Sequence, residues 1–123
     1  MEEMGREAMR LEAGARRAVR NSIQGVCRHE GWTLLALHVR ATHVHVVVKA
    51  EATPECVLAK LKAYATRDLN KRFGRRAKRW TRHGSTRRLW SAYEVDAAVD
   101  YVLNRQGEPM EVYEFADRWS DIL

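Results

Sequence analysis

Two apolar runs separated by very few residues constrain the fold of this chain more than any other feature. Residues 32–40 read WTLLALHVR and residues 42–50 read THVHVVVKA, and both are rich in the apolar and β-branched residues that favour strands. So short a connection joins neighbouring antiparallel strands, which predicts a tight hairpin turning around Arg40–Thr42. No Asn-Gly or similar dipeptide marks the turn, so its position stays open.

Helical patterns precede and follow this hairpin. Residues 6–30 carry apolar side chains at helical spacing, namely Ala15, Val19, Ile23, Val26 and Cys27. After the hairpin, Thr53 suits an N-cap, and an apolar stripe continues toward Gly74. A Ser-x-x-Glu capping box at Ser91 predicts a third helix that runs to about Arg105.

Length and composition fit one globular unit. The chain has 123 residues, of which 46% are hydrophobic and 31% charged, so it can bury one modest core. Residues 1–123 therefore form a single domain, ending in an acidic, aromatic tail at 108–123. Strands combined with helices predict an α+β fold, a ferredoxin-like α/β sandwich with an antiparallel sheet covered by helices.

The charge and the cysteines bear on partners and location. A net charge of +6 favours a polyanionic partner, although many basic proteins bind none. The two cysteines form no CxxC pair, which indicates reduced thiols. No apolar signal core or run of roughly 20 apolar residues is present, so we expect no membrane association and a cytoplasmic location.

Two histidines stand one residue apart in the second strand. Because a strand alternates its faces, His43 and His45 point to one side, while Val44, Val46 and Val48 point to the core. Their Cα atoms are expected roughly 6.5–7 Å apart, which lets two imidazoles converge on one metal ion. The alternative is a pair of surface histidines on an exposed sheet face.

Tyr101 is unusual in its position on the third helix. Val95, Val99 and Val102 share one helical face, and Tyr101 falls well away from it, on the polar side. Such a ring is an incidental surface residue, a contact with another subunit, or a chemical group.

A dense basic stretch runs from the end of the second helix to the start of the third. Ten lysines and arginines occur from Arg67 to Arg88 against one acid, Asp68, with tryptophans interspersed. In a DNA site, cationic side chains contact the phosphates and aromatic rings stack on unpaired bases, so this composition suits DNA binding. A solvated loop anchored by its tryptophans is the alternative. The candidate DNA-binding residues are Arg72, Arg75, Arg76, Lys78, Arg79, Trp80, Arg82, Arg87 and Arg88.

Together these motifs resemble the HUH single-tyrosine transposases, in particular the REP-associated tyrosine transposases and their bacterial IS-type relatives. THVHVVV matches the two histidines that flank a hydrophobic residue, WTRHGSTRRLW resembles a strand of one branch, and AVDYVLNRQGEPM resembles the tyrosine helix. The similarity covers roughly residues 28–110.

The resemblance implies an activity and a set of partners. Tyr101 would be the nucleophile, and His43 and His45 would hold a divalent cation, Mg²⁺ or Mn²⁺. The enzyme would cut and rejoin single-stranded DNA near hairpins through a 5′-phosphotyrosine intermediate. It would act as a homodimer on bacterial, nucleoid-associated DNA, with the tyrosine serving its own or its partner's histidines.

The chain departs from the family pattern in two places. A third polar ligand usually lies one helical turn past the tyrosine, but that position holds Arg105, which cannot bind a cation. Asn104 and Gln106 flank it, and we favour Gln106. The family also begins with a strand that residues 1–10 do not offer, so the chain is short at its N-terminus or its sheet is completed otherwise, for instance across a dimer. Both departures leave open a catalytically inactive relative that binds DNA hairpins.

Overall fold

The predicted hairpin forms the centre of the structure. In the computed structural model, which describes residues 10–75, 80 and 86–115, β1 (Thr33–Val39) pairs antiparallel with β2 (Val44–Lys49). The Arg40 amide donates to the His43 carbonyl oxygen at 2.8 Å and closes the turn. The hairpin is therefore confirmed, but β2 begins two residues later than predicted, because Thr42 and His43 belong to the turn.

A third strand comes from the acidic tail, where the sequence predicted none. β3 (Glu111–Glu114) pairs antiparallel with the other edge of β1, which makes the strand order β2-β1-β3. The Arg20 guanidinium lies 5.9 Å from the centre of the Tyr113 ring and 3.7 Å from the Glu111 carboxylate. These contacts attach the described part of the tail to β1 and to the first helix.

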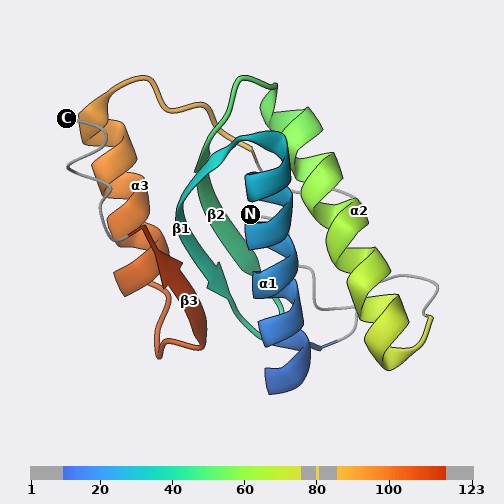
Figure 1. Ribbon diagram of the computed structural model, residues 1–123. Helices are drawn as coiled ribbons and strands as arrows, with labels where there is room; N and C mark the ends of the chain where they lie inside the picture. The colour runs from blue at the N-terminus through green and yellow to red at the C-terminus, as the bar shows by residue number, and fades with distance from the viewer. Residues whose placement is uncertain (1–9, 76–79, 81–85, 116–123) are drawn as a thin grey trace.

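Helices cover both faces of this sheet (Figure 1). α1 (Ala13–Glu30) and α2 (Pro54–Phe73) lie on one face, where their apolar stripes pack against Leu37 and Val39. α3 (Ala92–Asn104) lies on the other face, with Val99 and Val102 against the sheet. The predicted α+β class and the α/β sandwich are confirmed.

The helix ends follow local chemistry. The Thr53 hydroxyl accepts a hydrogen bond from the Cys56 amide at 3.2 Å, as expected of an N-cap. The predicted capping box also forms, since the Ser91 hydroxyl and the Glu94 carboxylate each accept the other residue's backbone N–H. α3 ends at Asn104, one residue before the predicted end.

The first helix is shorter than predicted. Within the described residues it begins at Ala13, and the Leu11 amide donates to the Ala41 carbonyl oxygen at 2.7 Å. That bond keeps the chain before Ala13 out of the helix and beside the hairpin turn. Residues 6–9 of the predicted helix, and the question of an N-terminal strand, lie outside the described residues.

Candidate active site

The face of the sheet beneath α3 carries the candidate chemistry. Val44, Val46 and Val48 pack toward α1 and α2, as predicted, so the intervening positions of β2 face α3. The histidine face is not open surface, because Val47 is buried there against Val99 and Val102. The histidines therefore lie at one end of a second small core.

The two predicted histidines lie side by side. The ring centroids of His43 and His45 are 6.1 Å apart and the planes are inclined by 8°. The Thr42 hydroxyl lies 2.9 Å from Nδ1 of His43, which leaves Nε2 of that ring available to another ligand. A turn residue and a strand residue thus present a parallel pair of imidazoles.

Tyr101 approaches this pair from α3. Its ring meets the ring of His45 edge-on, with centroids 6.2 Å apart and planes at 87°. Val99 and Val102 turn toward the sheet and are buried, which leaves Tyr101 at the margin with 55% of its surface exposed. One chain therefore brings the candidate nucleophile and the histidine pair together.

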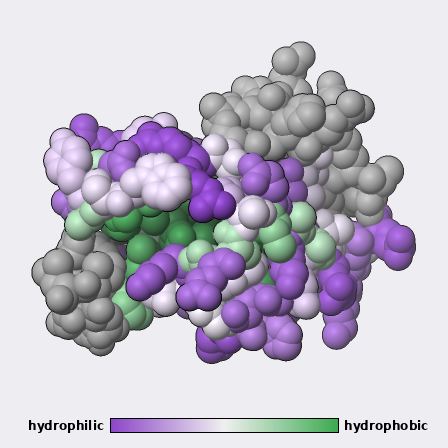
Figure 2. Space-filling model, turned by 90° about the horizontal axis from the view of Figure 1, so that it is seen from above, coloured by the Kyte–Doolittle hydropathy of each residue, from purple (hydrophilic) through white to green (hydrophobic). Residues whose placement is uncertain are grey.

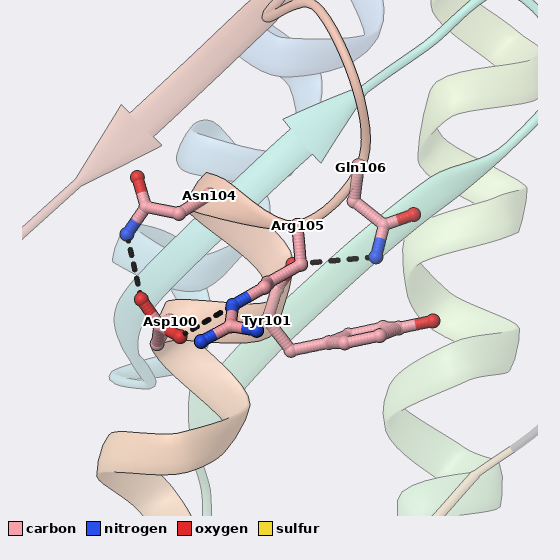
Figure 3. A network of polar contacts seen from close by, with 5 residues as sticks. All are labelled: Asp100, Tyr101, Asn104, Arg105 and Gln106. Carbon is pink, nitrogen blue, oxygen red and sulfur yellow. Dashed lines mark hydrogen bonds and ion pairs between the residues drawn. The ribbon is translucent and has the colours of Figure 1, made fainter.

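The three polar residues after Tyr101 point in different directions (Figure 3). Asn104 and Arg105 both bind the Asp100 carboxylate, at 2.8 and 3.1 Å. The Gln106 side chain extends on the same side as the Tyr101 ring, and its amide nitrogen donates to the Tyr101 carbonyl oxygen at 3.2 Å. Because an amide nitrogen cannot bind a cation, this bond leaves the oxygen of Gln106 as the group that could.

His38 is a residue of this site that sequence reasoning missed. It is fully buried, and it lies directly across the hairpin from His45. Its Nδ1 lies 3.2 Å from the Val102 carbonyl oxygen, and its Nε2 accepts the Met110 amide at 3.0 Å. A carbonyl only accepts and an amide N–H only donates, so the ring is neutral with its proton on Nδ1. Burial holds the pKa of His38 below its ordinary value.

The electrostatics of His45 suit metal binding. Burial, followed by the neighbouring His43, lowers the pKa of His45 to about 4, so the ring is neutral at physiological pH and its nitrogen lone pair is free. Among the described residues, no group of three or more His, Cys, Asp or Glu side chains could hold a metal ion. Imidazole nitrogens and an amide oxygen, such as that of Gln106, are donor types that divalent transition-metal ions accept.

The basic residues predicted to bind DNA occupy several places. Arg72 and Arg75 are exposed at and just beyond the end of α2, and Arg87 and Arg88 are exposed before α3. Trp80 is half-buried, and its indole N–H donates to the Thr66 hydroxyl at 2.6 Å. This contact attaches Trp80 to α2. The other predicted residues lie outside the described part of the chain: Arg76, Lys78, Arg79 and Arg82.

A groove of about 540 Å³ runs along the outer edge of β2, between the start of α2 and the segment before α3. Seen from above in Figure 2, apolar side chains line a hollow between hydrophilic ones. Arg87, Arg88 and Trp90 are among its lining residues, and Trp90 is 76% exposed with the Arg88 guanidinium 5.7 Å from its ring centre. Its apolar wall includes Val46, Val48, Val57, Leu61, Leu89 and Val95.

Comparison with known families identifies the class of protein. The family model described as "Transposase IS200 like" matches residues 5–102, a span that includes the histidine pair, Tyr101 and the hairpin. The chain belongs to this family of transposases. No curated protein and no solved structure matches it. No helix among the described residues is long and apolar enough to cross a membrane.

Proposed function

We propose that this transposase cuts and rejoins single-stranded DNA through a covalent bond between Tyr101 and a 5′ phosphate. The observation that carries the proposal is the edge-on contact between the Tyr101 and His45 rings within one chain. A tyrosine on a helix margin has no structural need to lie against one of a pair of imidazoles. Its exposed position also leaves the hydroxyl accessible to a large substrate.

The chemistry conserves one ester bond. The phenolic oxygen of Tyr101 attacks phosphorus as its proton leaves, and the bond from phosphorus to the 3′ oxygen breaks. The products are a 5′-phosphotyrosine and a strand that ends in a 3′-hydroxyl, which takes up a proton. Since one phosphoester replaces another, the reverse attack by a 3′-hydroxyl rejoins strands without ATP.

The histidine pair is suited to a divalent cation. Bound by His43, His45 and the oxygen of Gln106, such an ion would polarise the scissile phosphate and screen its negative charge. Imidazole ligands suit Mn²⁺ better than Mg²⁺, which prefers an all-oxygen environment. The orientation of Gln106 supports it over Asn104 as the third ligand, because Gln106 extends on the side of the Tyr101 ring and Asn104 points away from it (Figure 3).

The basic surface would hold the DNA on either side of this site. Arg72, Arg75, Arg87 and Arg88 are exposed and available to phosphates, and Trp90 offers an exposed ring on which an unpaired base can stack. The contact of Tyr101 with His45 of its own chain supports cleavage in which the tyrosine serves its own subunit's histidines. The homodimer and the preference for DNA hairpins stay predictions.

A denaturing gel tests the proposal. The protein is incubated with Mn²⁺ and hairpin-bearing single-stranded DNA that is labelled on the 3′ side of the candidate cleavage positions. We expect a covalent protein–DNA adduct that is lost in Tyr101→Phe and reduced at least tenfold in His45→Ala. Tyr93→Phe is the matched control, since Tyr93 is exposed at the start of the same helix.

An inactive relative that binds DNA hairpins is the second candidate, and the replacement of the usual third ligand by Arg105 favours it. In that case the wild-type protein would retard the same DNA on a native gel and form no adduct under any metal. An adduct of equal yield in Tyr101→Phe would instead show that another residue is the nucleophile.

A further inference from the structure

Arg40 carries a positive charge that forms no ion pair within residues 10–75, 80 and 86–115. The residue is half-buried at the end of β1, and its Nε is buried without a hydrogen-bond partner. None of the ion pairs found among the described residues includes its guanidinium. A half-buried cation that lacks a partner loses part of its hydration without gaining a compensating contact, which is unfavourable unless a ligand supplies that contact.

The position of Arg40 places this charge at the candidate active site. Side chains alternate along a strand, so Arg40 follows His38 on the face beneath α3. Its backbone N–H is bonded to the carbonyl oxygen of His43. Its positive charge also lowers the pKa of both His38 and His45, although less than burial does.

The guanidinium also contacts the segment that follows Tyr101. Gly107 adopts a left-handed conformation with φ of 81°, and a Cβ built there would lie 3.4 Å from Nη2 of Arg40. The guanidinium therefore lies close to the backbone directly after Gln106. The backbone of Arg40 is therefore bonded to the first histidine of the pair, and its guanidinium lies beside the segment that ends the tyrosine helix.

We infer that Arg40 binds a non-bridging oxygen of the DNA phosphate that Tyr101 attacks. This inference rests on the proposed function and assigns to that site a residue outside its histidines, tyrosine and glutamine. A phosphodiester is the anion that the proposed reaction brings to this place, and a guanidinium donates hydrogen bonds to phosphate oxygens in a fixed planar geometry. Negative charge that builds on those oxygens during attack would strengthen the contact.

The first experiment measures anion binding without any DNA chemistry. Inorganic phosphate is titrated into the metal-free protein while amide resonances are followed by NMR. We expect saturable shifts at Gly107 and in residues 43–45 that disappear in Arg40→Gln. Arg17→Gln is the matched control, because it removes the same charge from an exposed position on α1 and should leave these shifts unchanged.

Thermal stability separates a binding role from a structural one. Because no ion pair or hydrogen bond of the Arg40 guanidinium is found within the described part of the chain, Arg40→Gln should leave the Tm unchanged or raise it, whereas the loss of a structural contact would lower it. Added phosphate should raise the Tm of the wild-type protein and of Arg17→Gln, but not of Arg40→Gln. A lowered Tm in Arg40→Gln with intact phosphate shifts would overturn the inference.

The covalent adduct assay then links the residue to the reaction. We expect adduct formation to slow by about a hundredfold in Arg40→Gln, as for loss of one preorganised donor, and to recover partly in Arg40→Lys. If the wild type forms no adduct but phosphate still binds at Arg40, the proposed function fails and the anion site stands. If phosphate binds equally to Arg40→Gln, the inference fails whatever the adduct assay shows.

Discussion

The buried imidazole of His38 shows how strongly a polar side chain depends on its partners. From β1, its two nitrogens bond to Val102 of α3 and to Met110 of the chain before β3. Sequence reasoning treated residues 32–40 as a plain core strand, because a histidine among leucines and valines gives no sign of what it will bind. The motif of two histidines and Tyr101 was visible because each residue stood out in a local pattern.

Replacing His38 by leucine should destabilise the fold. The substitution keeps an apolar side chain in the core but leaves the Val102 carbonyl and the Met110 amide without this partner, each a loss of about 1–3 kcal/mol when buried. Urea denaturation of the variant measures the loss. His29→Leu, at an exposed position of α1, should change the free energy of unfolding by less than about 0.5 kcal/mol. Equal stability of the two variants would contradict the role given to His38.

At the scale of elements, the helix caps could be predicted from local sequence signals, whereas the third strand depends on tertiary contacts. The capping box of α3 and the N-cap of α2 were predicted correctly, because a cap is a contact between residues close in sequence. β3 was missed for the opposite reason. Four residues are too few to display a strand pattern by themselves, even with valine and tyrosine among them, and the strand forms by pairing with the free edge of β1.

The cap of α3 should contribute measurably to stability. Ser91→Ala removes the hydroxyl that accepts the Glu94 amide, which we expect to cost about 1 kcal/mol. Ser91→Asp keeps an oxygen in the same place and should restore most of the loss. Thermal denaturation monitored by circular dichroism compares the two variants. A similar loss in both would mean that the capping bond does not hold the start of this helix.

At the scale of the whole molecule, the two cysteines differ in solvent exposure, since one lies in the core and the other on the surface. Cys27 is buried in the core between α1 and the sheet, and burial raises its pKa to about 11, whereas Cys56 is exposed at the start of α2. The thiolate is the reactive form, so Cys27 is protonated as well as inaccessible at pH 8.

A thiol-reactive dye should therefore modify one cysteine per chain in the native state and two after denaturation. Absorbance at pH 8, with and without guanidinium chloride, counts the modified groups. Cys56→Ser should abolish labelling of the native protein and leave the labelling of Cys27 after denaturation intact. Rapid labelling of native Cys56→Ser would show that the core between α1 and the sheet opens locally under conditions in which the protein stays folded.

The sequence alone determined the hairpin, the helices with their caps, and the identity of His43, His45 and Tyr101 as residues that needed explanation. Those features depend on periodicity and on contacts between near neighbours, which a sequence displays directly. Only the tertiary structure decided that Tyr101 meets His45 in the same chain, that Gln106 rather than Asn104 lies on the side of that ring, and that His38 and Arg40 face the site. The physical reason is that such contacts join segments distant in the chain, whose approach depends on how the sheet and α3 pack.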